Sequence, residues 1–161
     1  MFTVTERTGK MAIYMQKTTP KAAKPWPKKF TPGPFELKVK RSRAGLGLFT
    51  LSPIKKGACV IEYVGKLLTK EEDEASTSLY LFDAGGGVTI DGAPRWNTAR
   101  YINHSCRPNC EIDIYKHRVF VLAKRNIKPG EELTYDYDKE YFNEYIKPKG
   151  CRCDKCSPAQ K

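Results

Sequence analysis

Three cysteines lie within six residues near the C-terminus, in the segment Cys151-Arg-Cys-Asp-Lys-Cys156. Thiolates this close together are typical of one tetrahedral Zn²⁺ rather than of disulfides. Such a site needs a fourth ligand, and the other cysteines, Cys59, Cys106 and Cys110, are all distant in sequence. The spacing therefore predicts that the C-terminal end of the chain is held against its body by zinc. The alternative is a set of free surface thiols.

The fourth zinc ligand must come from Cys106 or Cys110. We expect Cys106 to bind together with Cys151, Cys153 and Cys156, with Cys110 as the alternative. Cys59 falls in a β-branched run and is interpreted as a buried, small hydrophobic residue.

The positive charge is concentrated in the N-terminal arm. Residues 1–43 contain 11 basic and 2 acidic residues, a net charge of +9, whereas residues 44–161 contain 18 and 16, a net charge of +2. A cationic arm suits weak, salt-sensitive contact with nucleic-acid phosphates or acidic proteins. The alternative is a solvated tail without a partner.

The sequence has no apolar run of about 18 residues, so no membrane span is expected. Residues 1–30 lack the apolar core of a signal peptide, which predicts an intracellular protein, cytoplasmic or nuclear. An intracellular location also disfavours a disulfide framework.

Short strands follow a Pro- and Lys-rich segment, residues 1–34, which is expected to be a poorly ordered arm. Thr69 and Glu72 form a capping-box pattern that predicts one helix. Lys116-His117 is interpreted as a hairpin turn. The pattern predicts a mainly β fold of several small sheets with short helices. The expected strands cover residues 35–40, 58–64, 79–82, 88–91, 110–115 and 118–123.

Motifs in a fixed order carry a family resemblance. They are Arg43-Ala-Gly-Leu-Gly-Leu48, Arg100-Tyr-Ile-Asn-His-Ser-Cys-Arg-Pro-Asn109, Gly130-Glu-Glu-Leu-Thr-Tyr-Asp-Tyr137 and the C-terminal cysteine segment. Together they resemble the SET-domain protein lysine methyltransferases with a post-SET zinc tail, over residues 35–156. The resemblance implies twisted small β-sheets, a knot-like C-terminal threading, a SET domain at 35–148 and a zinc tail at 149–161.

The resemblance also implies a binding site for S-adenosylmethionine. Ala44, Gly45 and Leu46 match the loop whose backbone approaches this cofactor, where glycine permits close contact. Further matching residues are Tyr80, Arg100, Asn103 and His104.

Three tyrosines match the family's catalytic positions. Tyr137 corresponds to the active-site tyrosine beside the transferred methyl group, and Tyr80 to a tyrosine lining the lysine channel. Tyr135 stands where members carry Phe or Tyr, the position that governs the room for added methyl groups. Each could instead be a core tyrosine with a satisfied hydroxyl.

The expected substrate is a protein with an accessible lysine, such as a histone tail or another basic protein. One alternative is a catalytically silent SET module that binds protein or nucleic acid through its basic arm. Another is a zinc-stapled nucleic-acid-binding domain. Because Tyr80, Asn103, His104 and Tyr137 are all present, the sequence favours the active enzyme.

Overall fold

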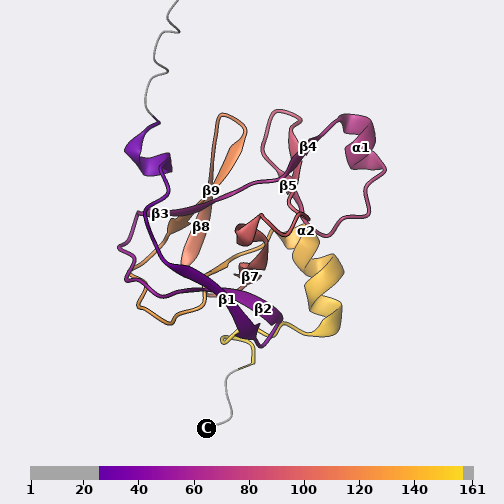
Figure 1. Ribbon diagram of the computed structural model, residues 1–161. Helices are drawn as coiled ribbons and strands as arrows, with labels where there is room; N and C mark the ends of the chain where they lie inside the picture. Colours follow the sequence, from indigo (N-terminus) through magenta and orange to yellow (C-terminus); the bar gives the residue numbers. More distant parts are fainter. Residues whose placement is uncertain (1–25, 158–161) are drawn as a thin grey trace, which may run out of the picture.

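The computed structural model describes residues 26–157. Within this range the strands form four small sheets, two with two strands and two with three (Figure 1). The prediction of a mainly β fold with short helices is confirmed. No helix among the described residues is long and apolar enough to cross a membrane.

The first sheet is an antiparallel hairpin of β1 (Leu37–Ser42) and β2 (Gly45–Thr50). The period-two pattern of the sequence predicts β1 about two residues early. At the turn of the hairpin, Ser42 pairs with Gly45. Gly45 has a φ of +121°, which residues with a Cβ rarely adopt.

The central sheet has the order β3 (Cys59–Tyr63), β9 (Arg118–Ala123) and β8 (Cys110–Tyr115). The predicted hairpin of β8 and β9 is confirmed at both ends. Its turn residues, Lys116 and His117, both have positive φ, 51° and 57°, as a two-residue type I′ hairpin turn requires. Five consecutive residues of β9 are buried, so this strand forms the centre of the core.

The third sheet has the order β4 (Lys66–Leu68), β6 (Thr89–Asp91) and β5 (Leu81–Asp83). Between β4 and β5 lies α1 (Lys70–Glu74), whose capping box is confirmed. The Thr69 hydroxyl accepts the Glu72 N–H at 3.2 Å, and the Glu72 carboxylate accepts the Thr69 N–H at 3.0 Å.

The fourth sheet pairs β7 (Asn103–His104) in parallel with β10 (Thr134–Tyr135). A short 3₁₀ helix, η2 (Thr98–Tyr101), leads into β7. Asn103 lies opposite Thr134 and His104 opposite Tyr135, so this pairing brings together two motifs that are 31 residues apart in sequence.

A helical segment that the sequence does not predict follows β10. It consists of α2 (Lys139–Tyr141), the π-helical η3 (Phe142–Ile146) and the 3₁₀ helix η4 (Lys147–Lys149). Figure 1 shows it as a continuous helical ribbon between the sheets and the C-terminal tail.

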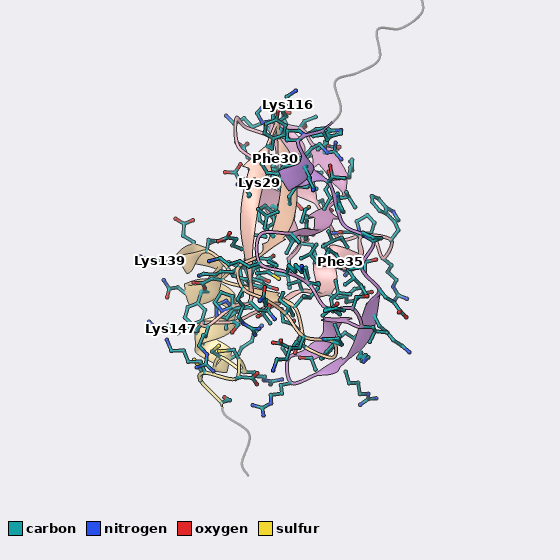
Figure 2. The ribbon with its side chains drawn as sticks, turned by 90° about the vertical axis from the view of Figure 1, so that its left-hand side faces the viewer. Lys29, Phe30, Phe35, Lys116, Lys139 and Lys147 are labelled. Carbon is teal, nitrogen blue, oxygen red and sulfur yellow. The ribbon has the colours of Figure 1, made fainter. Side chains whose placement is uncertain are left out.

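The end of the N-terminal arm packs on the central sheet. Within η1 (Lys28–Phe30), the Phe30 ring stacks on Tyr115 with 4.6 Å between ring centroids. Lys29 also forms an ion pair with Asp113, and Figure 2 shows Lys29, Phe30 and Lys116 at one end of the molecule, away from Lys139. Residues 26–34 therefore contact the sheet, while residues 1–25 of the predicted arm lie outside the described residues.

The core joins the sheets and fixes the segments that carry the motifs. It includes Ile102, just before the Asn-His pair, and Leu133, just before β10. The largest fully buried side chains are Phe120, Leu48, Ile54, Ile102, Ile127 and Leu133.

Candidate active site and metal site

One cavity of about 1230 Å³ collects most of the residues that the sequence marks as functional. This volume exceeds the roughly 300–1,000 Å³ of typical ligand pockets, so there is room for more than one ligand group. Of the predicted cofactor and catalytic residues, those lining it are Ala44, Leu46, Tyr80, Arg100, Asn103, His104 and Tyr137. Gly45 and Tyr135 do not line it.

The Asn103 side chain is anchored by both of its amide hydrogens. Nδ2 donates to the Leu46 carbonyl at 2.9 Å and to Glu132 Oε1 at 2.7 Å. Oδ1 has no hydrogen-bond donor among the described residues, and it is an acceptor beside the cavity. The β1–β2 turn, β7 and the segment before β10 therefore meet at this one amide.

Glu132 is a functional residue that the sequence analysis missed. Its second carboxylate oxygen accepts the Ser42 hydroxyl at 2.8 Å, so it holds Asn103 and the β1–β2 hairpin together. A Cβ at Gly47 would lie 2.3 Å from Glu132 Oε1, so glycine is needed there for the carboxylate to approach. Only a contact between distant segments reveals this role.

Asn109, the last residue of the Asn-His motif, holds the neighbouring segment in place. It is buried, donates to the Glu132 carbonyl at 2.7 Å and accepts the Thr134 N–H at 2.9 Å. Because these bonds fix residues 132–134, Asn109 supports the pairing of β10 with β7.

Arg100 stacks on Tyr80, with its guanidinium carbon 4.0 Å from the ring centroid. The same guanidinium donates to the Ala93 carbonyl. Its Nε is buried and has no hydrogen-bond partner among the described residues. An unpaired buried donor costs free energy.

Tyr137 follows β10 and presents its hydroxyl near β7. The O–H donates to the Ile102 carbonyl at 2.8 Å. Burial raises the pKa of the phenol, so the hydroxyl stays neutral. Because its proton is committed to a carbonyl, the Tyr137 oxygen is left as a hydrogen-bond acceptor.

Tyr135 lies behind Tyr137, with 4.8 Å between ring centroids, and also faces Phe82 at 6.3 Å. Burial raises its pKa well above the usual range. On the other side of Tyr137, Tyr141 lies at 5.3 Å and is followed by Tyr145. Tyr141 and Tyr145 line the cavity but were missed, because the sequence gives no clear helical pattern after Tyr137.

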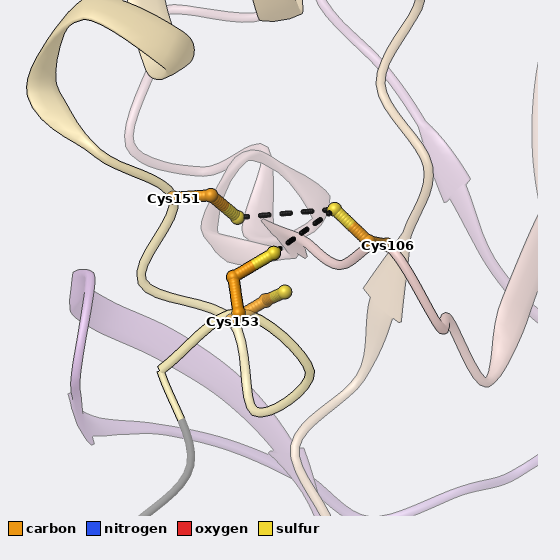
Figure 3. Close-up of side chains that lie close together, drawn as sticks. Cys106, Cys151 and Cys153 are labelled. Atoms are coloured by element: carbon orange, nitrogen blue, oxygen red, sulfur yellow. Dashed lines mark hydrogen bonds between the residues drawn. The ribbon is translucent and has the colours of Figure 1, made fainter.

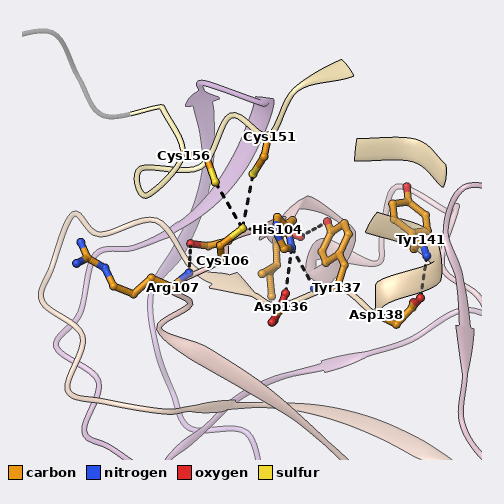
Figure 4. A network of polar contacts seen from close by, with 11 residues as sticks. His104, Cys106, Arg107, Asp136, Tyr137, Asp138, Tyr141, Cys151 and Cys156 are labelled. Atoms are coloured by element: carbon orange, nitrogen blue, oxygen red, sulfur yellow. Dashed lines mark hydrogen bonds and ion pairs between the residues drawn. The ribbon is translucent and has the colours of Figure 1, made fainter. Parts of the chain in front are cut away.

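The His104 ring lies between Cys106 and Tyr137 (Figure 4). Burial lowers its pKa, against an opposing effect of Asp136, so the imidazole is neutral near neutral pH.

The cysteine cluster brings together Cys106, Cys151, Cys153 and Cys156, whose sulfur atoms all lie within 4.8 Å of one another (Figure 3). Cys106 Sγ is 3.9 Å from Cys151 Sγ and 3.7 Å from Cys156 Sγ. Zn–S bonds of about 2.3 Å in a tetrahedron require sulfur separations of about 3.8 Å, so the cluster fits a zinc ion. Cys110 is buried in β8, outside this group.

The thiols differ in their readiness to ionise. Burial and the neighbouring thiols raise the pKa of Cys106 to about 12. At Cys153 burial acts in the same direction, but backbone hydrogen bonds outweigh it and lower the pKa to about 6. Zinc binding to this cluster therefore displaces protons.

The tail that carries the cysteines is also a wall of the cavity, which is lined by Cys151, Arg152, Cys153, Asp154 and Lys155. Arg43, in the β1–β2 turn, donates to the Ser157 carbonyl and lies 3.5 Å from Asp154 Oδ1. The cysteine cluster therefore holds one wall of the cavity in place.

The geometry defines a β-rich domain with an Asn-His pair beside a buried tyrosine and a cysteine-bound tail. The SET domain family model matches residues 45–138, more than half of the chain. The protein belongs to the SET-domain family.

Curated relatives match the same region. The chain is 40% identical over 122 residues to the histone-lysine N-methyltransferase ash1 of Drosophila melanogaster, covering 68% of this chain and 5% of that protein. It is 39% identical over 124 residues to trithorax of Drosophila virilis, a histone-lysine N-methyltransferase, covering 70% and 3%. The chain thus spans at most a twentieth of the length of these relatives.

A solved structure has the same fold. The crystal structure of KRYPTONITE in complex with mCHH DNA, H3(1–15) peptide and SAH superposes with a TM-score of 0.59. The sequences are 31% identical, and the match covers 71% of this chain and 26% of that one. The fold expected from the resemblance is confirmed.

Proposed function

We propose that this protein transfers a methyl group from S-adenosylmethionine to the side-chain amine of a lysine in a protein substrate. The observation that carries the proposal is the meeting of Asn103, Tyr80 and Tyr137 at one cavity, with the Tyr137 oxygen left as an acceptor. The histone-lysine methyltransferase relatives and the SAH complex of KRYPTONITE support it.

The cofactor side of the cavity offers groups of the required kinds. Oδ1 of Asn103 is an acceptor for an ammonium group, and the Arg100 side chain lines the same cavity. Ala44 and Leu46, on either side of Gly45, border the same space. Bound there, S-adenosylmethionine supplies an activated methyl group that a neutral amine takes up while the sulfur keeps the bonding electron pair.

The tyrosines suit the lysine side because the amine must be neutral to react. Near neutral pH, losing the proton from an ordinary lysine costs roughly 4 kcal/mol, since its pKa is about 10.4. A carboxylate beside the amine would raise this cost, whereas a neutral phenol does not hold the proton. Tyr137 therefore accepts an N–H from the amine and orients its lone pair, which removes part of the entropic barrier.

The proposed substrate is a histone tail or another basic protein. The relatives named as histone-lysine methyltransferases and the H3 peptide complex of KRYPTONITE support this choice of substrate. A histone substrate implies that the protein acts in the nucleus or on chromatin. Weak nucleic-acid contact through residues 1–43 rests on their net charge of +9.

Zinc has a structural role in this proposal. Cys106, Cys151, Cys153 and Cys156 would hold it and so fix the tail against the cavity. The proposed domain boundaries remain an arm at 1–34, a SET domain at 35–148 and a zinc tail at 149–161.

Cofactor binding tests the proposal directly. We expect Asn103→Ala to weaken the affinity for S-adenosylmethionine by about tenfold or more, because it removes an acceptor and frees Glu132 and the Leu46 carbonyl. Isothermal titration calorimetry measures this. Asn143→Ala, an asparagine outside this cavity, is the control and should bind as wild type. Wild-type protein that binds no S-adenosylmethionine would refute the proposed cofactor.

The product is expected to be mainly monomethyl-lysine. The Tyr135 ring lies 4.8 Å from that of Tyr137, so we expect its hydroxyl to limit the room for a methylated amine next to Tyr137. Leaving that hydroxyl without a hydrogen-bond partner costs about 1–3 kcal/mol, or roughly ten- to a hundredfold in rate. Tyr135→Phe should shift the product toward di- and trimethyl-lysine. Mass spectrometry at early times checks this, and abundant trimethyl-lysine from the wild type would contradict it.

A further inference from the structure

A chain of polar contacts runs from the cysteine cluster through His104 to Tyr137 (Figure 4). His104 Nε2 lies 3.3 Å from Cys106 Sγ, and Nδ1 lies 3.1 Å from the backbone nitrogen of Tyr137. Only 5% of the imidazole side chain is exposed. The two ring nitrogens thus contact two different functional segments.

The contacts determine which ring nitrogen carries the proton. A backbone N–H can only donate, so Nδ1 must accept from Tyr137 with its lone pair. A neutral imidazole then has its single proton on Nε2, directed at the Cys106 sulfur. Asp136 Oδ1 is 3.5 Å from Nδ1, but it is an acceptor facing an acceptor, and its side chain is 67% exposed.

We propose that His104 is a positioning residue that couples the cysteine cluster to the backbone of Tyr137. Its Nε2–H is directed at Cys106 Sγ, and this contact fixes the ring so that Nδ1 holds the Tyr137 N–H. The importance of Tyr137 rests on the proposed function, whereas the coupling itself does not.

This coupling gives the cysteine tail a route of contacts to Tyr137. His104 ends β7 and Cys106 follows two residues later, while Tyr137 follows β10, the parallel partner of β7. Residues that hydrogen-bond to the ligands of a metal commonly orient those ligands and tune their basicity. Here the contacts lead from the Cys106 sulfur through the imidazole to Tyr137, the residue proposed to orient the amine.

Two substitutions separate the two bonds of the imidazole. In His104→Asn the amide oxygen replaces Nδ1 as the acceptor for Tyr137, and the donor to Cys106 is lost. In His104→Gln the amide nitrogen replaces Nε2 as the donor to Cys106, and the acceptor for Tyr137 is lost. A residue that only fills space would not distinguish these variants.

We expect His104→Asn to lose mainly zinc affinity and His104→Gln to lose mainly turnover. His104→Asn should lower the zinc affinity by about tenfold, with a smaller fall in kcat at saturating zinc. His104→Gln should lower kcat by about tenfold, with a smaller fall in zinc affinity. Chelator competition measures zinc affinity, and labelled methyl transfer measures kcat. His117→Asn, in the β8–β9 turn, is the control and should change neither quantity.

A spectroscopic measurement on the wild type stands apart from activity and from variant folding. Nitrogen-15 NMR of the zinc-bound protein should show His104 with its proton on Nε2 and Nδ1 unprotonated. A proton on Nδ1, or equal losses of both quantities in both folded variants, would overturn the proposal. If the wild type transferred no methyl group, the proposed function would fail, while the tautomer and the zinc affinities would still decide the coupling.

Discussion

Tyr137→Phe lowers kcat for lysine methylation by roughly a hundredfold while cofactor affinity stays close to that of the wild type. In the proposed mechanism the phenol oxygen orients the amine, whereas the residues proposed to hold the cofactor are Ala44, Leu46, Arg100 and Asn103, which line the same cavity. The substitution also leaves the Ile102 carbonyl without its donor, which costs about 1–3 kcal/mol of stability. Rates are therefore measured well below the unfolding temperature of the variant, with calorimetry for cofactor binding.

The matched control is Tyr115→Phe, which removes a phenol hydroxyl from β8 outside the cavity. It should leave kcat unchanged. A folded Tyr137→Phe protein that turned over like the wild type would show that the assigned role of Tyr137 is wrong.

Cys106→Ser should lower zinc affinity by more than about a hundredfold. Mutation of a residue that only hydrogen-bonds to a metal ligand already lowers metal affinity by about 10- to 100-fold, and Cys106 is itself an expected ligand. Loss of zinc should also abolish tight cofactor binding, because the cysteine tail is one wall of the cavity and is otherwise held mainly by Arg43. Metal analysis after gel filtration gives the zinc content, and calorimetry gives the cofactor affinity.

Cys110→Ser is the control for the identity of the fourth ligand. Cys110 is buried in β8, so the variant loses some stability but should keep one zinc ion per chain. Zinc retained in Cys106→Ser and lost in Cys110→Ser would reverse the assignment.

Local patterns in the sequence predict local structure well. The β8–β9 hairpin and the capping box of α1 are confirmed because each depends on residues at most a few positions apart. The grouping of Cys106 with the tail cysteines, expected from the thiol spacing, agrees with their proximity in the structure.

The contacts that assemble the site could not be predicted in the same way. Glu132 bonds to Asn103 and Ser42, which are 29 and 90 residues away in sequence, and nothing local marks it. Tyr141 and Tyr145 lie on a three-residue α-helix and a π-helical turn, which are too short to give a hydrophobic period. Their roles depend on packing against Tyr137 and the cavity.

The position of Tyr135 shows a further limit of sequence reasoning. The family pattern marks this tyrosine for its influence on added methyl groups, but the sequence cannot show that it lies behind Tyr137 and outside the cavity lining. Any effect of its hydroxyl on the product must therefore pass through the space next to Tyr137.

The most direct measurement of the central claim is mass spectrometry of protein incubated with S-adenosylmethionine carrying an isotopically labelled methyl group. Histones, a mixture of basic proteins and the protein itself serve as acceptors. We predict the label on the side-chain nitrogen of lysine, with Tyr137→Phe reducing it strongly and Tyr115→Phe leaving it unchanged. Label on another residue type, or no label on any acceptor from protein that binds both zinc and S-adenosylmethionine, would contradict the account.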